Sequence, residues 1–347
     1  MAVKRVFMKL GIFIGIFLVT VSLLLLSVLW YNNNKVVNWL NNPRPPGQLI
    51  SVGSHKLYTT VKGEGSPTVI LLPGMNAFSW GWWGIQDEIS ETTRVVTYDR
   101  AGYGWSEAGP EPYSGKQIVT ELHTLLQRLQ IEPPYILVGA SMGGLYARHY
   151  AKLYPDDVAG VIFADPSAWD EADLRSRPKQ DAVVAQRESR SFNEVFASFG
   201  GFRFFGSYFL RMHRIPDSVM PLVLEALSNP EQHKNFQRHF AALYRVDDSH
   251  FLNAPEGFPQ IPVKVIVQDS DVTVGDAVRY QEIKGDASEK KARQYLQSVK
   301  QRQREEYMGL SSDSQWIMAE GSGHNIQHER PDLLMQVIRD MVVAIRK

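Results

Sequence analysis

A serine flanked by two glycines is the feature that most constrains the fold of this chain. Residues 139–143 read Gly-Ala-Ser-Met-Gly, a G-x-S-x-G pattern centred on Ser141. The apolar run Tyr-Ile-Leu-Val at 135–138 precedes it directly, and a helical pattern at 145–150 follows. Such a short motif is weak alone, but between a strand and a helix it predicts a tight turn. The glycines leave room for that turn, which holds the serine at the carboxyl end of a sheet.

Short apolar runs alternate with helical stretches along the rest of the chain. The candidate strands are residues 49–52, 56–61, 69–72, 95–98, 135–138, 158–164, 263–267 and 315–319. One helical stretch between them repeats its apolar residues on a single face: Ile118, Leu122, Leu125, Leu126 and Leu129. Continuous apolar strands alternating with helices predict the α/β class, with a buried, mostly parallel sheet and right-handed crossovers.

Four motifs in order carry a resemblance to a known family: Leu-Leu-Pro-Gly-Met at 71–75, Tyr-Asp-Arg-Ala-Gly-Tyr-Gly-Trp-Ser at 98–106, the motif around Ser141, and Gly-His-Asn-Ile at 323–326. Together they resemble the α/β-hydrolase fold family over residues 49–347. The resemblance implies a mostly parallel eight-stranded sheet flanked by helices, with a helical cap. It also implies a serine hydrolase. One departure is Pro73, where the family usually has histidine. The sequence therefore does not determine the shape of the loop at residues 71–75.

The base that activates a serine hydroxyl is expected to be a histidine. His324 follows the last candidate strand, where the family places its base, and the chain order Ser, acid, His fits. His328 is expected to be a surface or supporting group. His149, on the helix after the motif, is expected to be structural.

Three aspartates compete for the role of the acid that orients this histidine. Asp271 is preferred, since residues 265–271 resemble the family's acid loop after the seventh strand. Asp165 directly follows the sixth candidate strand, where some families of this fold carry their acid. Its simpler interpretation is a helix cap or a turn former before Pro166. Asp269 is the third candidate, and chain order does not separate the three.

Two backbone amides are expected to form the oxyanion hole, the N–H groups of Met142 and Met75. The simpler interpretation of both methionines is packing. Because the groups are backbone, side-chain substitution tests them only indirectly.

A serine in this position points to carboxylic esters, including lipid-like esters, as substrates of an acyl-enzyme mechanism. The alternatives are a carbon–carbon bond hydrolase or a perhydrolase with the same triad, and a non-catalytic ligand receptor on the same fold. No cofactor is expected, since the sequence has no apparent metal-ligand cluster and no Gly-rich phosphate loop.

No charged residue occurs from Leu10 to Asn34, and residues 10–30 are almost entirely apolar. A bilayer-spanning helix needs about 20 such residues. Lys4, Arg5 and Lys9 precede the run, which predicts a single-pass anchor with a cytoplasmic amino terminus and an extracytoplasmic catalytic domain. The alternative is a signal segment that is cleaved to release a secreted protein, although no small-x-small site is evident.

These features together predict the domain organisation. Residues 1–31 form a cytoplasmic tip and transmembrane anchor, 32–48 a linker, 49–166 and 259–347 the hydrolase core, and 167–258 a helical cap. Aromatic residues crowd one stretch of the cap: Phe192, Phe196, Phe199, Phe202, Phe204, Phe205, Tyr208 and Phe209. They predict either packing onto the core, or an apolar acyl-binding wall or membrane-facing lid.

The 37 basic and 37 acidic residues cancel, but they are unevenly placed. Residues 1–35 carry four basic residues and no acidic one, so the remainder has a net charge of −4. This charge does not suit a nucleic-acid partner, and the charge-rich residues 282–306 are expected to form a solvated helix. The chain has no cysteine, which excludes disulfides and thiolate chemistry and suits a domain outside the cytoplasm.

Overall fold

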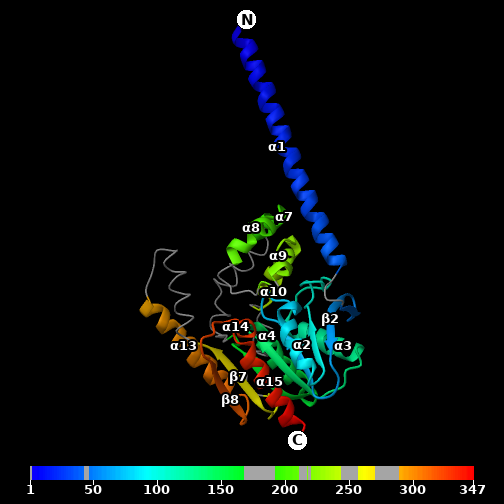
Figure 1. Cartoon of the computed structure of the whole chain (residues 1–347), viewed down its shortest axis with the longest axis vertical. Coiled ribbons are helices and arrows are strands. Elements are labelled where there is room, and N and C mark those ends of the chain that lie inside the picture. The colour runs from blue at the N-terminus through cyan, green and yellow to red at the C-terminus, as the bar shows by residue number, and fades with distance from the viewer. Residues whose placement is uncertain are drawn as a thin grey trace. The chain divides into compact units, whose positions relative to one another are not determined.

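The computed structural model describes residues 2–42, 47–167, 192–210, 217, 220–243, 257–269 and 289–347 (Figure 1). The described strands are β1 (Gln48–Ser51), β2 (Lys56–Lys62), β3 (Thr68–Leu72), β4 (Val95–Tyr98), β5 (Tyr135–Ala140), β6 (Val158–Ala164), β7 (Val263–Gln268) and β8 (Ser314–Ala319). The described α-helices are α1 (Ala2–Asn41), α2 (Trp83–Ser90), α3 (Gly115–Arg128), α4 (Met142–Leu153), α7 (Phe192–Ser198), α8 (Gly201–Leu210), α9 (Met220–Leu227), α10 (Pro230–Leu243), α13 (Glu289–Met308), α14 (Ile326–Glu329) and α15 (Pro331–Ile345). Two short 3-10 helices, η1 (Ser79–Trp82) and η2 (Pro155–Asp157), complete the set.

All eight predicted strands are present and join one sheet, in the order β1-β2-β4-β3-β5-β6-β7-β8. The pairs β1–β2 and β2–β4 are antiparallel, and every other pair is parallel. The observed ends lie within two residues of the predicted ones. The predicted α/β class with a mostly parallel eight-stranded sheet is therefore confirmed.

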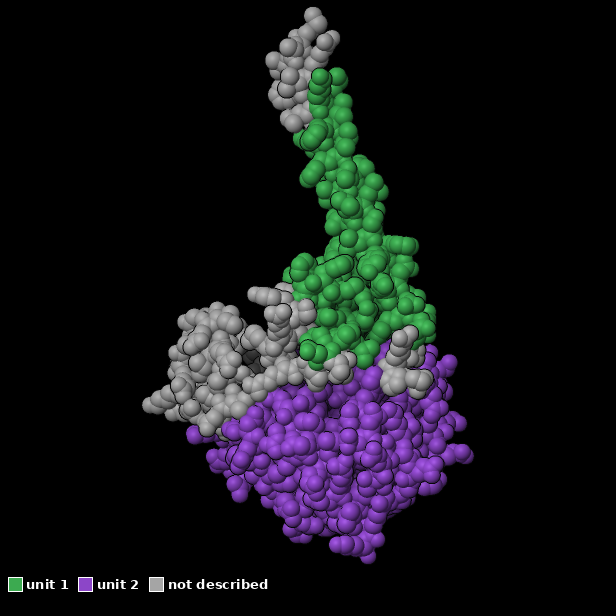
Figure 2. Space-filling view, viewed as in Figure 1, with its two compact units in different colours: residues 1–43, 190–234 green, residues 44–189, 235–347 purple. Residues whose placement is uncertain are grey.

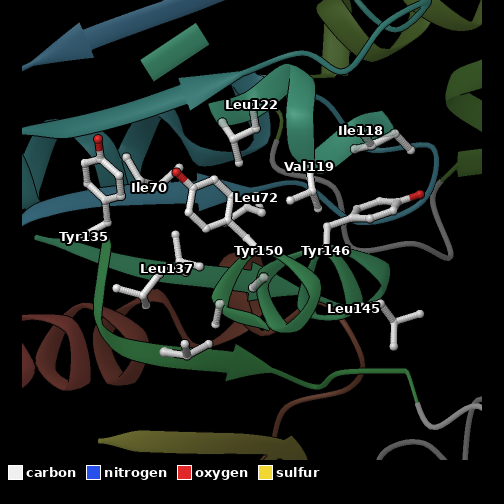
Figure 3. Packing of buried hydrophobic residues seen from close by; sticks show 14 of the residues in the cluster. Ile70, Leu72, Ile118, Val119, Leu122, Tyr135, Leu137, Leu145, Tyr146 and Tyr150 are labelled. Carbon is white, nitrogen blue, oxygen red and sulfur yellow. The ribbon is translucent and has the colours of Figure 1, made fainter. Parts of the chain in front are cut away.

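Each central strand is buried on both faces, because its side chains alternate between two hydrophobic clusters. In β5, Leu137 joins one cluster while Ile136 and Val138 join the other. The first cluster includes residues of α3 and α4 and the end of α13, and the second includes residues of α2 and α15. Figure 3 shows part of the first cluster, with the α4 residues Leu145, Tyr146 and Tyr150 beside the strands. The sheet is thus the middle of three layers.

Helix α3 confirms the predicted amphipathic face. Ile118, Leu122, Leu125 and Leu126 are buried, and Leu129 packs against the same cluster from the C-cap position. Ser114 begins the helix, since its side chain accepts a hydrogen bond from the backbone N–H of Gln117.

The chain divides into two compact units, coloured separately in Figure 2. Unit 1 comprises residues 1–43 and 190–234, and unit 2 comprises residues 44–189 and 235–347. Unit 2 holds the sheet and the helices on its faces. Unit 1 joins α1 to helices α7, α8 and α9, which lie between β6 and β7 in the sequence. Only part of the predicted cap at 167–258 lies among the described residues, so its boundaries stay a prediction.

Helix α1 is longer than the sequence predicts. Residues 32–41, expected to be linker, continue the helix to Asn41. The physical reason is packing within unit 1, since Asn32, Val36 and Trp39 are buried on one side of this last segment. These positions are spaced four and three residues apart and so share one helix face.

The segment Gly11–Asn41 of α1 is long and apolar enough to cross a membrane, with a mean hydropathy of 2.9 in its most apolar window and none of that window buried. By length and composition, both a membrane anchor and a signal sequence meet this description.

Candidate active site

Ser141 lies at the sharp turn between β5 and α4 and has φ 50° and ψ −119°. A non-glycine residue rarely adopts this geometry, which marks a strained site. The glycines on either side are required by close approach. A Cβ on Gly143 would lie 2.2 Å from the carbonyl oxygen of Leu72, and one on Gly139 would lie 2.5 Å from the carbonyl oxygen of Gly143. The predicted strand–turn–helix is therefore present.

The ends of neighbouring parallel strands bring Ser141 close to Asp165. The last residues of β5 and β6, Ala140 and Ala164, are paired, and the backbone N–H of Ser141 donates to the carbonyl of Ala164 at 3.0 Å. Asp165 follows β6 with φ 44°, a second strained residue. Polar groups that follow parallel strands meet at one edge of the sheet, where ligands bind in α/β proteins.

His324, in the loop after β8, contacts this aspartate. Its Nδ1 lies 2.5 Å from Oδ2 of Asp165, whose side chain is 2% exposed, whereas the imidazole is half exposed. The other carboxylate oxygen, Oδ1, accepts a hydrogen bond from the backbone N–H of Gln268 at 3.1 Å. The carboxylate is thus held on one side by β7 and orients the histidine on the other.

The charges around His324 favour its protonated form. Burial opposes protonation, but the hydrogen bond and charge of Asp165 and the charge of Glu329 outweigh it and raise the pKa of His324 above its usual 6.5. Glu329 also supports the loop, since its Oε2 accepts a hydrogen bond from the backbone N–H of Gly323 at 2.8 Å. The site therefore stabilises an imidazolium.

The other two candidate acids have different outcomes. The carboxylate Oδ2 of Asp269 accepts a hydrogen bond from the backbone N–H of Gly321 at 3.0 Å, so it supports the turn after β8. Asp271, the preferred candidate, lies outside the described residues. Among the described aspartates, Asp165 is the one that the structure places on His324.

The predicted oxyanion loop packs against the serine. A Cβ on Gly74 would lie 3.3 Å from Cβ of Ser141, so the peptide that leads to Met75 lies beside the turn that holds Ser141. Met142 begins α4, and its side chain is fully buried in the first hydrophobic cluster. Met75 packs against the same cluster. Both side chains therefore pack as their simpler interpretation predicts, and their backbone amides remain the candidate donors.

Arg100 binds the backbone of the predicted oxyanion loop, a role that the sequence did not indicate. Its Nη1 donates to the carbonyl of Pro73, and its Nη2 donates to the carbonyl of Gly74 at 2.6 Å. The guanidinium is buried and lies over the rings of Tyr103 and Tyr146, 4.9 and 5.4 Å from their centroids. Because a trans peptide points C=O and N–H in opposite directions, this hold aims the N–H of Met75 away from Arg100. The only sequence signal was an arginine within residues 98–106.

His149 is fully buried and His328 is partly buried, and burial is the main influence on the pKa of each. Burial lowers the pKa of His149 to about 3, with smaller contributions from the charges of Lys152 and Lys116. Burial also lowers the pKa of His328, although the charge of Glu329 opposes this. His328 lies against η1, since a Cβ on Gly81 would lie 3.4 Å from its ring.

Metal ligation finds no support in the part of the chain that the structure describes. There, no group of three or more His, Asp or Glu side chains is placed to hold a metal ion.

Comparison with known families agrees with this architecture. A family model described as the alpha/beta hydrolase fold matches residues 67–293, which is more than half of the chain. The chain belongs to the α/β hydrolase fold family, and on this membership we class it as a hydrolase.

One curated relative and the solved structures cover most of the chain at low identity, and another relative matches about a third of it. The uncharacterized protein YqjL of Bacillus subtilis (strain 168) is 24% identical over 284 residues, 82% of this chain and 86% of that protein. The probable transporter efuK of Hormonema carpetanum is 31% identical over 125 residues, which are 34% of this chain. The match spans only 18% of the length of efuK. An enol-lactonase from Burkholderia xenovorans LB400 has 18% identity and a TM-score of 0.59, covering 85% of this chain and 100% of its own. A thermophilic esterase from Thermogutta terrifontis has 19% identity and a TM-score of 0.58, covering 86% and 100%. These two structures show a shared fold.

Proposed function

We propose that this chain is a serine hydrolase that cleaves a carboxylic ester or lipid-like ester through an acyl-enzyme intermediate. The observation that carries the proposal is the contact between Asp165 and His324 at the sheet edge where Ser141 occupies its strained turn. A base, an orienting acid and a serine hydroxyl on one edge of the sheet are the parts that nucleophilic catalysis needs. The shared fold of an esterase and an enol-lactonase supports an ester substrate.

The reaction proceeds in two steps, acylation of Ser141 and hydrolysis of the acyl-enzyme. Oγ of Ser141 attacks the ester carbonyl while Nε2 of His324 takes the hydroxyl proton, and the tetrahedral oxyanion then collapses as that proton passes to the leaving alcohol. Water next attacks the acyl-enzyme, gives its proton to His324, and releases the acid as the proton returns to Ser141. The carboxylate of Asp165 holds the imidazole tautomer and stabilises the imidazolium in both steps.

We assign the acid to Asp165, although the sequence alone favoured Asp271. Asp165 is nearly fully buried, has a hydrogen bond from the backbone N–H of Gln268 on one oxygen, and contacts Nδ1 of His324 with the other. Asp269 serves the turn at Gly321 instead. A buried carboxylate fixed at both oxygens is well suited to orient a base, because little reorganisation is needed during the reaction.

The oxyanion donors of the proposal are the backbone N–H groups of Met142 and Met75. Met142 is the first residue of α4, where helix N–H groups are free of intrahelical partners. Arg100 orients the peptide between Gly74 and Met75 through its carbonyl. Two oriented N–H groups beside the nucleophile stabilise negative charge as it develops.

The proposal places the catalytic unit on the extracytoplasmic side of a membrane, anchored by an uncleaved α1. The apolar part of α1 is exposed and of bilayer length, and basic residues precede it. The same helix then continues without a break to Asn32, Val36 and Trp39, which are buried in unit 1. No small-x-small cleavage site is evident at the end of the apolar segment, which favours a permanent anchor over a cleaved signal.

Labelling with a fluorophosphonate, which reacts with activated serines, tests the function. We expect the full-length protein to be labelled and Ser141→Ala to abolish labelling. Ser167→Ala is the matched control, because Oγ of Ser167 lies only 3.4 Å from Oγ of Ser141. Labelling that survives Ser141→Ala contradicts the proposed nucleophile. Hydrolysis of an ester panel of graded acyl length then tests the substrate class, and labelling without turnover of any ester contradicts it.

A further inference from the structure

Helix α1 changes character abruptly between Tyr31 and Asn32. Most residues before this point are apolar and exposed, with Leu23 and Leu24 about 60% exposed. From Gly11 to Tyr31 the helix is about 30 Å long, the thickness of a bilayer core. After it, Asn32 is 2% exposed, and its helix face is buried in unit 1. The membrane boundary of the proposed anchor therefore falls at this position.

Asn32 ties the ends of two helices to that boundary. Its Nδ2 donates to the carbonyls of Ala197 at the end of α7, at 2.9 Å, and of Ser228 just after α9, at 3.1 Å. The turn that leads from α7 into α8 lies at the same place, because a Cβ on Gly200 would lie 3.2 Å from Oδ1 of Asn32. The start of α8 is thus level with the end of the apolar segment.

The phenylalanines of this region divide into an inner and an outer set. Phe196 and Phe202 pack ring to ring at 5.1 Å, and Phe202 stacks on His233 at 5.0 Å. The outer set is exposed by 36–77%: Phe192, Phe199, Phe204 and Phe205. The inner set therefore accounts for packing within the unit, and Phe192 of the outer set stacks on Phe196 at 5.6 Å. Packing of this kind does not explain the exposed rings of Phe199, Phe204 and Phe205.

The outer phenylalanines lie close to the membrane boundary. A Cβ on Gly200 would be 3.2 Å from the ring of Phe204 as well as from Asn32, so Phe204 and Asn32 flank the same residue. Phe199 precedes that residue, and Phe205 is five residues further on, within about 8 Å along a helix axis. Interfacial helices bury their apolar faces about 5–10 Å into the boundary between headgroups and acyl chains.

We propose that Phe199, Phe204 and Phe205 insert into the interfacial layer of the bilayer that α1 spans, so that α8 lies on the membrane surface. This inference rests on the proposed anchor. A lipid surface is favoured over a second copy of the chain because α8 is held at the membrane boundary by Asn32. Buried hydrogen bonds from Asn32 join α1 to the end of α7 and to the residue after α9, and Nε of Arg203 in α8 donates to Oδ1 of Asn32 at 3.4 Å. When α1 spans the bilayer, these three rings therefore lie at the membrane surface.

The absence of cysteine allows a direct test on the full-length protein in liposomes. Single variants Phe204→Cys and Phe205→Cys carry an environment-sensitive fluorophore, and the lipids carry a nitroxide quencher either near the headgroup or deep in the acyl chain. Leu24→Cys reports on the anchor, and the exposed Asn38→Cys reports on the aqueous end of the same helix. We expect headgroup quenchers to reduce the fluorescence at 204 and 205, deep quenchers to reduce it at 24, and neither to affect 38.

The outcomes separate the two proposals. If the label at 24 is quenched but the labels at 204 and 205 behave like the label at 38, the anchor stands and the docking of α8 is wrong. If the label at 24 is also unquenched, both are wrong. Self-quenching at 204 that grows with the protein-to-lipid ratio, without quenching by lipid nitroxides, identifies a second copy as the occupant and also overturns the inference.

Discussion

The carboxylate of Asp165 and the imidazole of His324 are 159 positions apart in the sequence and 2.5 Å apart in the structure. The contact exists because β6 and β8 both run parallel to β5 and end at the same edge of the sheet, with β7 between them. Each residue directly follows or closely follows its strand. The hydrogen bond from Gln268 to Asp165 then ties β7 to the same group.

Asp165→Asn is expected to reduce kcat by roughly 10⁴-fold, because an amide does not enforce the imidazole tautomer that accepts the serine proton. Steady-state hydrolysis of a short ester measures this loss. Asp269→Asn is the control, and its effect is expected to be small because that carboxylate supports a turn. If Asp271→Asn causes the large loss and Asp165→Asn does not, the assignment of the acid is wrong.

The pH profile provides a second test of the same pair. His324 must be neutral to act as a base, so kcat/KM rises with pH through the pKa of His324. Since the Asp165 contact raises that pKa, we expect the acid limb to lie above pH 6.5. In the residual activity of Asp165→Asn the limb moves to lower pH, because the hydrogen bond and the negative charge that favour the imidazolium are lost. A limb that does not move would show that another group raises the pKa.

Arg100→Lys is expected to lower kcat by about 10²-fold with little change in KM, because lysine does not donate to both carbonyls of the oxyanion loop in a planar fork. Comparison of kcat and KM for a short ester measures this split. The variant also needs a thermal unfolding measurement, since the side chain is buried. Activity lost only in proportion to unfolded protein, or lost through KM, would argue against a positioning role.

Acid is expected to destabilise unit 2 partly through His239. Its ring lies between Tyr103 and Tyr113, and burial and the charge of Arg100 lower its pKa to about 3, although its hydrogen bond to the Ala101 carbonyl opposes this. Below about pH 6.5 the unfolded chain binds a proton here that the folded chain refuses down to about pH 3. The free energy of unfolding therefore falls with decreasing pH, by at most about 1.4 kcal/mol per pH unit.

Thermal unfolding at pH 7 and at pH 5 measures this contribution. In His239→Gln the amide retains a donor for the Ala101 carbonyl but does not titrate, so the difference in stability between the two pH values is expected to shrink. An unchanged difference would show that His239 does not contribute.

Asn32→Ala is expected to weaken the link between α1 and helices α7 and α9 by about 1–3 kcal/mol, because buried carbonyls lose their donor. Faster amide hydrogen exchange or proteolysis in residues 192–228 measures the loss. Asn33→Ala is the matched control, since Asn33 is the exposed neighbour on the same helix. Equal effects from both substitutions would contradict the role of Asn32.

Much of the fold was predictable because its signals are local. Buried strands are recognisable in the sequence as apolar runs. The buried face of α3 is recognisable as apolar residues that recur every three or four positions, and the turn at Ser141 as two glycines spaced for a tight turn. The extension of α1 to Asn41 was not predictable, because its asparagine-rich surface hides the buried stripe of Val36 and Trp39. Val36 and Trp39 are buried only because α1 packs against α7 and α9, which are distant in the sequence.

The sequence by itself determined the class of fold, the order of the strands along the chain, the serine at the turn and the histidine after the last strand. These depend on residues that are neighbours in the chain. The tertiary structure alone placed Asp165 on His324 and Arg100 behind the oxyanion loop. Three aspartates met the requirement of chain order equally well. Among the two that the structure describes, Asp165 and Asp269, the register of the parallel strands brings Asp165 to the imidazole. Hydrogen bonds depend on distance and direction in space, which order along the chain does not specify.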